Sequence, residues 1–349
     1  MFLFAVCQPG AERALKSFAS RAAVPGGLRL AFSKPGFVTF KSDAPVALAA
    51  HHPLDDCPFA RSWGQSIGEA TGISAIAQSV GALEPARVHV FPMGAGAFAE
   101  LDPAALDAAN SLASALRATF PKLEIVAPGA HAIAQSGERV ADVAVTTPES
   151  AWVGLHVHTP DRTPYPGGLI PISLPGDAPS RAYLKLEEAL HRFALPLRAG
   201  DLAIELGSAP GGASWALCQR GLRVLGVDPG DMDPRVLASP LFEHRKVPAG
   251  ALQRSDLPRG ARWLLVDMNL APRVSLRYAE RVAGPLRKSL IGAVVTLKIN
   301  DDAAEQALPQ LIERVRALAD FDWVRATQLP SNRSEVCVVA RRLEPKKGL

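Results

Sequence analysis

Short apolar runs and longer amphipathic segments alternate through the second half of the 349-residue chain. Four of the runs have the length and apolar content of buried strands, and they are 202–207 (LAIELG), 223–228 (RVLGVD), 263–269 (WLLVDMN) and 293–298 (AVVTLK). Strands that alternate with helices predict an α/β fold with a doubly wound, mostly parallel sheet. Two further runs, 322–329 and 335–342, are joined only by the residues PSNRS. Because a parallel pair needs a longer crossover, we expect an antiparallel hairpin here.

The first half has a different pattern, with two segments in each of which several strand-like runs accompany one helical stretch. Residues 1–57 contain three such runs and a helical stretch at 12–22, which predicts a small α+β domain. The segment 58–160 has a predicted helix at 106–120 and further strand-like runs, at 87–93, 122–127, 141–147 and 151–159. A stretch rich in Pro and Gly follows it. We therefore expect a linker at 161–180 and a separate domain after it.

A glycine loop lies between the first two predicted strands of the second half. It runs from Gly207 to Gly212, and because Ala209 stands two places after Gly207, the loop lacks the G-x-G-x-x-G pattern of dinucleotide binding. Pro210 has no N–H and stiffens the turn, so the loop suits a nucleoside ligand without phosphates, such as S-adenosylmethionine. Asp228 ends the next strand, where a carboxylate can accept the hydroxyl groups of an adenosine ribose. A structural turn in another α/β protein would explain the loop equally simply.

Charged side chains stand where the predicted strands of this half end. Asp267 closes one strand, Lys298 closes the next and Glu335 begins the last. The carboxyl ends of parallel strands meet at one edge of a sheet, and an antiparallel last strand begins at that edge. Lys185 lies on the predicted helix that leads into the first strand. Each residue alone is best explained as a solvated charge or a helix cap, but together they predict two lysines and two carboxylates around one point.

This order of residues, with the ELGSAPGG loop between the first two, resembles the K-D-K-E ribose 2′-O-methyltransferases of the FtsJ/RrmJ type. Five stretches are similar to the RlmM-type branch of that family, and they are DAPSRAYLKLEEALHRF, ELGSAPGGASWALCQRG, VDPG, WLLVDM and TLKIN. Enzymes of this branch 2′-O-methylate a cytidine of 23S ribosomal RNA. CQPGAERAL and FARSW are similar to the ferredoxin-like and THUMP portions of the same branch. The resemblance therefore spans most of the chain.

The resemblance implies a division of the chain and a set of partners. It implies a ferredoxin-like α+β domain over 1–57, a THUMP-like RNA-binding domain over 58–160 and a Rossmann-like class I methyltransferase domain over 181–349. The implied substrate is 23S ribosomal RNA, met before the ribosome is fully assembled, in the cytoplasm. The implied cofactor is S-adenosyl-L-methionine, and the residues that match its contacts are Gly207, Ser208, Ala209, Pro210, Gly211, Gly212, Asp228 and Asp267.

The resemblance also implies a catalytic tetrad of Lys185, Asp267, Lys298 and Glu335, with Lys298 as the proton acceptor. A ribose 2′-hydroxyl is a very weak acid, so its attack on a sulfonium methyl group needs a base close by. A lysine can be that base once it has lost its own proton, and we expect the charge on Lys185 to favour this loss. Asp267 and Glu335 would orient the two lysines. Most of the acceleration should come from alignment of the reacting atoms, and no metal is required.

This sequence departs from the family pattern at two places. Ala182 stands three residues before Lys185, where the family has a serine, which removes a polar contact to the cofactor. Where the family has an acid before Asp267, this chain reads VPAGALQRSD, and only Asp256 is nearby. We therefore leave the residue that contacts the adenine open.

Composition narrows the remaining possibilities only a little. The net charge of +4 permits an RNA partner, and several arginines are candidates to follow phosphates near the cleft, although each is more simply a surface residue. They are Arg181, Arg192, Arg333, Arg341 and Arg342. Neither a signal peptide nor a membrane span is expected, because no apolar run reaches 18 residues. The four cysteines lack CxxC spacing, which fits a reducing compartment. The cluster His51, His52, Asp55, Asp56 and Cys57 matches no standard metal site.

Two other classes of function remain open on the sequence. A nicotinamide-dependent oxidoreductase could use the same first strand–loop–helix unit, although the missing G-x-G-x-x-G pattern argues against it. The second half could alternatively be an inactive scaffold attached to an RNA-binding module, which the complete set of four charged residues opposes. The target nucleotide and the oligomeric state cannot be derived from these residues.

Overall fold

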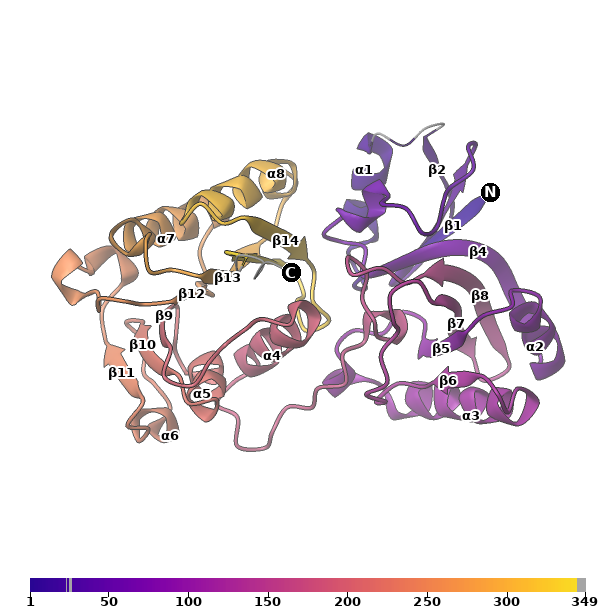
Figure 1. Ribbon diagram of the computed structural model, residues 1–349, viewed down its shortest axis with the longest axis horizontal. Helices are drawn as coiled ribbons and strands as arrows, with labels where there is room; N and C mark the ends of the chain where they lie inside the picture. The colour runs from indigo at the N-terminus through magenta and orange to yellow at the C-terminus, as the bar shows by residue number, and fades with distance from the viewer. Residues whose placement is uncertain (23, 25–26, 344–349) are drawn as a thin grey trace, which may run out of the picture. The chain divides into compact units, whose positions relative to one another are not determined.

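The computed structural model describes residues 1–22, 24 and 27–343, and the chain divides into two compact units, Met1–Ser173 and Leu174–Leu349 (Figure 1). The chain passes from one unit to the other within the expected linker. The further division of the first unit at residue 57 stays a prediction. Among the described residues, no helix combines the length and the apolarity that crossing a membrane requires.

The second unit is built on a seven-stranded sheet. Its strands are β9 (Leu202–Leu206), β10 (Arg223–Val227), β11 (Phe242–Arg245), β12 (Trp263–Val266), β13 (Gly292–Lys298), β14 (Trp323–Thr327) and β15 (Glu335–Arg341). They lie in the order β11-β10-β9-β12-β13-β15-β14. Strands β9 to β13 pair in parallel, whereas β15 is antiparallel both to β13 and to β14. The predicted mostly parallel sheet with a terminal antiparallel hairpin is therefore confirmed.

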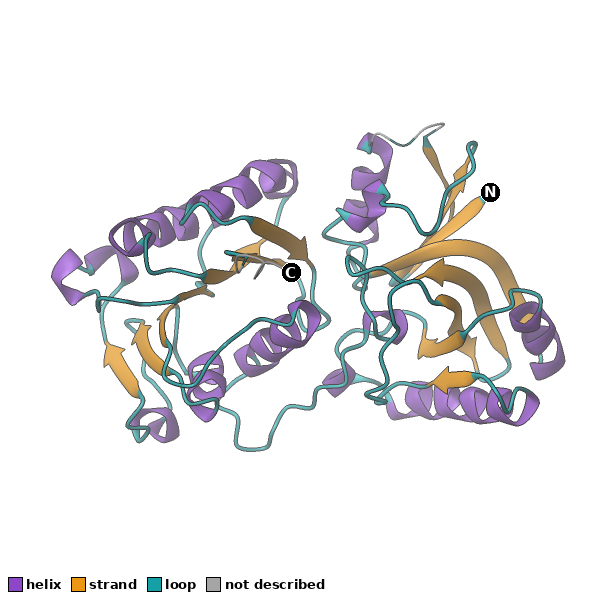
Figure 2. Cartoon of the chain, viewed as in Figure 1, coloured by secondary structure: helices purple, strands orange, loops and turns teal. Residues whose placement is uncertain are grey.

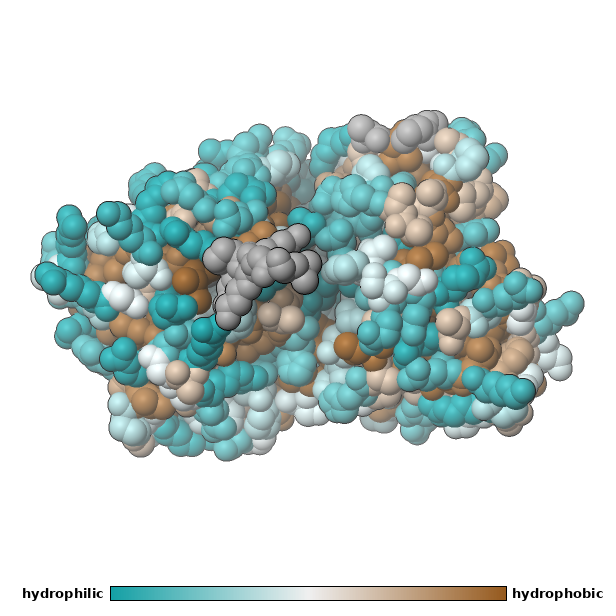
Figure 3. Space-filling model, viewed as in Figure 1, coloured by the Kyte–Doolittle hydropathy of each residue, from teal (hydrophilic) through white to brown (hydrophobic). Residues whose placement is uncertain are grey.

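Helices cover both faces of this sheet. They are α4 (Ala182–Phe193), α5 (Gly212–Gln219), α6 (Pro234–Leu237), α7 (Pro272–Leu286) and α8 (Asp302–Ala317), with short 3-10 turns η4 (Ala249–Ala251) and η5 (Arg254–Asp256). α4 packs against α5 on one face, and α7 packs against α8 on the other (Figures 1 and 2). Buried side chains recur every three or four positions along α7, as at Leu276, Ala279 and Val282. Figure 3 shows hydrophilic residues, in teal, over the outer side of α7 and α8.

An apolar core between α4 and the sheet determines the position of Lys185. Leu186 of α4 belongs to one buried cluster with Trp263 of β12 and Val294 of β13. Leu184 is also buried, so Lys185 stands between two leucines that face the interior. Burial of each such large apolar side chain contributes about 1.5–3 kcal/mol to stability. The docking of α4 by this core therefore fixes the lysine at one end of the sheet.

The first unit contains a single eight-stranded sheet with the order β2-β3-β1-β4-β8-β7-β5-β6. Its strands are β1 (Phe2–Val6), β2 (Leu28–Lys34), β3 (Phe37–Ser42), β4 (Ser62–Thr71), β5 (Arg87–Pro92), β6 (Glu124–Val126), β7 (Arg139–Thr147) and β8 (Ser150–Val157). Its helices and 3-10 turns are α1 (Glu12–Arg21), η1 (Pro53–Asp55), α2 (Ile73–Gly81), η2 (Phe98–Glu100), α3 (Pro103–Thr119) and η3 (Pro166–Gly168). The three strand-like runs expected within 1–57 are β1, β2 and β3, and the four expected within 58–160 are β5 to β8.

Two elements of this unit, β4 and α2, were not predicted. β4 reads SWGQSIGEAT, in which two glycines and several polar residues hide the usual alternation of a strand. It pairs with β1 on one side and with β8 on the other, and its register shifts between Ser66 and Gly68. β4 is therefore the strand that joins the N-terminal strands to the rest of the sheet.

Buried hydrogen bonds give a structural role to residues of the FARSW stretch and to Asp55 of the His/Asp/Cys cluster. Arg61 donates hydrogen bonds to the carbonyl oxygens of Cys7 at 2.9 Å and Ala95 at 2.6 Å. Trp63 Nε1 donates to Asp55 Oδ1 at 2.6 Å, and Arg162 Nε donates to the same oxygen at 3.0 Å. Asp55 therefore ties η1 to β4. In the part of the chain that the structure describes, no group of three His, Cys, Asp or Glu side chains could hold a metal ion.

Candidate active site

Four charged side chains meet at the carboxyl edge of the parallel strands. Lys185 comes from the first half of α4, and Asp267 directly follows β12. Lys298 is the last residue of β13 and Glu335 the first of β15, and the two face each other in the antiparallel register of these strands. The structure thus brings together the four residues that the strand-end pattern singled out, and local backbone structure explains each position.

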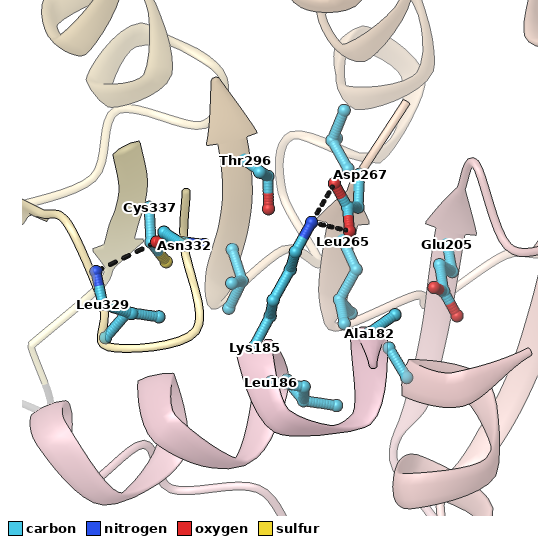
Figure 4. A pocket seen from close by; sticks show the side chains of 13 residues that line it. Ala182, Lys185, Leu186, Glu205, Leu265, Asp267, Thr296, Leu329, Asn332 and Cys337 are labelled. Carbon is cyan, nitrogen blue, oxygen red and sulfur yellow. Dashed lines mark hydrogen bonds and ion pairs between the residues drawn. The ribbon is translucent and has the colours of Figure 1, made fainter. Parts of the chain in front are cut away.

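Direct contacts link the four side chains. Lys185 Nζ lies 3.1 Å from Asp267 Oδ2 (Figure 4). It also lies 2.9 Å from Glu335 Oε2. Lys298 Nζ donates a hydrogen bond to Glu335 Oε1 and lies 3.8 Å from Asp267 Oδ1. The four side chains are only 11–20% exposed. Because they are largely shielded from water, their mutual electrostatic effects exceed those of surface ion pairs.

The two carboxylates hold the charge of one lysine in place. Burial disfavours the ammonium form of Lys185, but the nearby charges of Asp267 and Glu335 outweigh burial and raise the pKa of Lys185. Burial likewise disfavours the ionised Glu335, but its hydrogen bond from Lys298 and the charge of Lys185 lower the pKa of Glu335. At neutral pH, Lys185 is therefore cationic and Glu335 anionic.

The glycine loop begins at the carboxyl end of β9, next to this cluster. Gly207 has a φ of +85°, and a Cβ there would lie 2.5 Å from the carbonyl oxygen of Asp267. Gly211 has a φ of +115° and precedes α5 as its N-cap. Only glycine adopts these conformations readily. The loop therefore lies directly against the backbone of Asp267.

The third glycine of the loop has a packing role that sequence reasoning missed. A Cβ on Gly212 would lie 2.4 Å from Ser180 Oγ and 2.9 Å from the Tyr183 backbone nitrogen. Ser208 is 2% exposed, and Ala209 and Pro210 complete the turn. Gly212 thus permits the start of α5 to contact the start of α4, the helix that carries Lys185.

Asp228 lies at the same edge of the sheet, directly after β10. Its Oδ1 accepts a hydrogen bond of 2.7 Å from the backbone N–H of Gly230, which orients the carboxylate. β10 neighbours β9 in the sheet, so Asp228 and the glycine loop follow adjacent strands. Asp256, the other acid considered near this region, accepts a hydrogen bond of 2.8 Å from the Gln253 N–H and closes its own turn, η5.

Lys185 and Asp267 line a cavity (Figure 4). Glu205 and Asn332 are among the other polar residues that line it. Glu205 is fully enclosed on β9, and burial raises its pKa to about 8, although Ser214 Oγ donates a hydrogen bond to it at 2.5 Å. Glu205 therefore keeps its proton at pH 7. An acid inside the apolar run LAIELG is the sequence signal for this residue. Asn332 lies in the PSNRS link, where only its residue type could have drawn attention.

Two of the five arginines considered as phosphate contacts lie away from the cluster. Arg341 pairs with Gly292 at the opposite end of β15 from Glu335, and Arg342 donates hydrogen bonds to the carbonyl oxygens of Arg287 and Ala319. Arg341 and Arg342 therefore lie at the far edge of the sheet, which agrees with the simpler interpretation that they are not phosphate contacts. Of the others, Arg181 donates to the Ser331 carbonyl oxygen at 3.5 Å, Arg192 lies 5.2 Å from the Phe193 ring centroid, and Arg333 is exposed.

Part of this unit is similar to a known family of proteins. Residues 178–269, which include Lys185, the glycine loop, Asp228 and Asp267, match the FtsJ-like methyltransferase family. Ribosomal RNA large subunit methyltransferase M of Azoarcus sp. (strain BH72) is 35% identical over 223 residues, which cover 61% of this chain and 59% of that protein. The protein of the same name from Halorhodospira halophila is 29% identical over 358 residues, or 97% of this chain and 96% of the relative.

Solved structures are less similar. The fibrillarin pre-rRNA processing protein of Methanococcus jannaschii aligns with a TM-score of 0.36 and 10% identity, over 58% of this chain and 82% of that protein.

Proposed function

We propose, for a chain whose residues 178–269 match the FtsJ-like methyltransferase family, that it transfers a methyl group from S-adenosylmethionine to a ribose 2′-hydroxyl of ribosomal RNA. The observation that carries the proposal is the cluster of Lys185, Asp267, Lys298 and Glu335 beside the glycine loop. The proposed target is a cytidine of 23S ribosomal RNA before ribosome assembly is complete, which would place the reaction in the cytoplasm.

The residues around the glycine loop fit S-adenosylmethionine. The loop from Gly207 to Gly212 has no cationic side chain, and Pro210 offers no N–H. The loop is therefore poorly suited to phosphates and suits a nucleoside ligand that has none. Asp228, oriented by Gly230, offers carboxylate oxygens to the ribose hydroxyls. When bound, S-adenosylmethionine supplies an electrophilic methyl group on a sulfonium sulfur.

The two lysines have different roles in the proposed mechanism. Lys185 contacts both carboxylates and its pKa is raised, so it remains a fixed positive charge. Lys298 contacts Glu335 and is 3.8 Å from Asp267, which leaves it the less strongly held of the two. Lys298 is therefore the proposed base. As the new carbon–oxygen bond forms and the carbon–sulfur bond breaks, Lys298 accepts the 2′-hydroxyl proton.

The first unit, residues 1–173, has a separate role in this proposal. We infer that it combines a ferredoxin-like domain with a THUMP-like domain and that it holds the RNA, since the candidate catalytic cluster lies wholly in the second unit. The continuous sheet that β4 creates would make the two N-terminal parts one rigid support for the RNA.

We expect Asp228→Ala to weaken S-adenosylmethionine binding by about 1–3 kcal/mol, because two ribose hydroxyls would lose a common acceptor. Isothermal titration calorimetry measures this loss directly. Asp231→Ala is the matched control, since Asp231 is exposed, follows the same strand three residues later and pairs with Lys246. Wild-type affinity in Asp228→Ala would remove Asp228 from the cofactor site.

We expect the purified protein to convert a cytidine of undermodified 23S ribosomal RNA to 2′-O-methylcytidine. The assay is transfer of a labelled methyl group, followed by nuclease digestion and mass spectrometry of the nucleosides. Fully modified 23S ribosomal RNA is the matched control, because its target hydroxyl is already blocked. A methyl group on a base would contradict ribose chemistry, and an absence of transfer to any ribosomal RNA would favour the scaffold alternative.

A further inference from the structure

Asn332 contacts Glu335 from a buried turn. Its side-chain Nδ2 donates a hydrogen bond of 3.3 Å to Glu335 Oε2. Lys298 donates to the other oxygen of the same carboxylate, and Lys185 lies within 3.0 Å of both oxygens. Asn332 is 0% exposed, although an amide side chain usually reaches water. Its amide is therefore committed to contacts inside the protein.

The other end of the same amide closes the turn in which Asn332 lies. Asn332 Oδ1 accepts a hydrogen bond of 3.0 Å from the Leu329 N–H, and the Asn332 N–H donates to the Leu329 carbonyl oxygen at 2.9 Å (Figure 4). These two bonds determine the orientation of the amide, because its oxygen accepts from Leu329 and its nitrogen must then face Glu335. The side chain thus connects the backbone of the turn to the carboxylate.

The helix that carries Lys185 also holds this turn. Glu188, one turn after Lys185 on α4, is 1% exposed, and its Oε2 accepts hydrogen bonds from the Ser331 N–H at 2.8 Å and the Ser331 Oγ at 2.7 Å. A buried carboxylate with two donors is strongly held, because an unpaired charge there would be costly. α4 therefore fixes both the lysine and the residue that precedes Asn332.

We propose that Asn332 is a positioning residue for the methyl-transfer site, whose amide keeps the Glu335 carboxylate turned toward Lys185 and Lys298. Glu188 and Ser331 anchor the turn that carries this amide to α4. This role rests on the proposed function, since it acts through the proposed base. Asn332 does not itself take part in proton transfer.

The charged groups around Glu335 come from several neighbouring segments. Lys185 on α4 and Lys298 at the end of β13 contact it directly, and Asp267 after β12 contacts both lysines. The thiol of Cys337 on β15 also lines the cavity, and burial raises its pKa so that it stays neutral. The amide of Asn332 is thus a neutral donor among charged groups. It can orient the carboxylate without altering the net charge of the cluster.

Three different residues at position 332 distinguish the effect of the donated hydrogen bond from the effect of an added charge. Asn332→Ala removes the donor and should raise the pKa of Glu335, because loss of a hydrogen bond to the ionised form disfavours that form. Asn332→Asp keeps an acceptor for the Leu329 N–H, so the turn is retained, but it places a second carboxylate beside Glu335 and should raise the pKa of Glu335 further. Asn110→Asp and Asn110→Ala are matched controls, since Asn110 is exposed on α3.

The first measurement is a carbon-13 nuclear magnetic resonance titration of the Glu335 side-chain carboxyl in the full chain, assigned with Glu335→Gln. We expect the order wild type, Asn332→Ala, Asn332→Asp for increasing pKa of Glu335. A shift in Asn332→Asp without one in Asn332→Ala would overturn the proposal, because the added charge alone would then explain it. This readout does not require activity, so it is decisive even if methylation of ribosomal RNA is not found.

The second measurement is kcat against pH with undermodified 23S ribosomal RNA. A raised pKa leaves Glu335 protonated over a wider acid range, where it no longer orients the two lysines, so kcat should fall on the acid side of the profile, about threefold in Asn332→Ala and about tenfold in Asn332→Asp. The KM for S-adenosylmethionine should stay within about twofold of wild type. An equal fall in kcat at all pH values would indicate a merely structural role and overturn the proposal.

Discussion

Replacement of Lys298 by alanine should lower the single-turnover rate of methyl transfer by about 10²–10⁴-fold, the usual contribution of a general base. The expectation follows from the contacts of the two lysines, since Lys185 is held closely by both carboxylates whereas Lys298 is hydrogen-bonded to Glu335 and lies 3.8 Å from Asp267. The glycine loop and Asp228 are unchanged in this variant, so the affinity for S-adenosylmethionine should stay near that of the wild type. Rapid-quench assays with calorimetry on each variant measure both quantities.

A second substitution at the same position distinguishes a base from a positive charge. Lys298→Arg should be as slow as Lys298→Ala, because a guanidinium stays protonated and cannot accept the hydroxyl proton. Lys288→Ala is the matched control, since Lys288 is exposed before β13, at the opposite end of that strand. An active Lys298→Arg enzyme would show that the lysine supplies only charge.

Deletion of residues 1–173 should abolish methylation of 23S ribosomal RNA while S-adenosylmethionine binding remains near normal. The second unit has its own buried core, which includes Trp263, Leu186 and Val339, and the four-residue cluster lies within it. The deletion therefore removes the proposed RNA-holding unit without opening the core around the cofactor site. Thermal unfolding and calorimetry establish that the shortened chain is folded and binds the cofactor.

The control for this deletion is a substitution that leaves both units present. Glu100→Gln changes a charge of the first unit in the short turn η2, and we expect it to retain methylation. Efficient methylation of full-length 23S ribosomal RNA by the shortened chain would contradict the division of labour between the units. The outcome at Lys298 does not depend on this result, because it concerns chemistry within the second unit.

The predicted parts of the second unit depend on local features of the sequence. Short apolar runs must be buried strands, and a run that ends in a charged residue must expose that residue at the edge of the sheet. Asp267 and Lys298 could therefore be assigned to one edge before the strand order was known. The short PSNRS link allowed only an antiparallel hairpin, which brings Glu335 to the same edge. These inferences need only chain connectivity and the alternation of apolar and polar residues.

Other features depend on contacts between residues far apart in the chain. β4 has an irregular pattern and owes its burial to pairing with β1 and β8, so nothing in its own residues announces a strand. The raised pKa of Glu205 results from complete enclosure, which depends on the helices that cover β9. The position of Arg341 followed from the register of β15 with β13, which places it at the opposite end of the strand from Glu335.

The sequence by itself thus determined the strands of the sheet other than β11, the terminal hairpin and the residues available at the carboxyl edge, because these follow from local pattern and short connections. Only the tertiary structure decided which of the charged side chains contact one another. Lys185 reaches Asp267 and Glu335 across 82 and 150 residues of chain, and Ser331 reaches Glu188 across 143. Contacts at such separations depend on how α4 docks on the sheet and on the register of β13 with β15. That packing is not encoded by any single segment. It brings Lys185 close to both carboxylates, whereas Lys298 is close to Glu335 and 3.8 Å from Asp267.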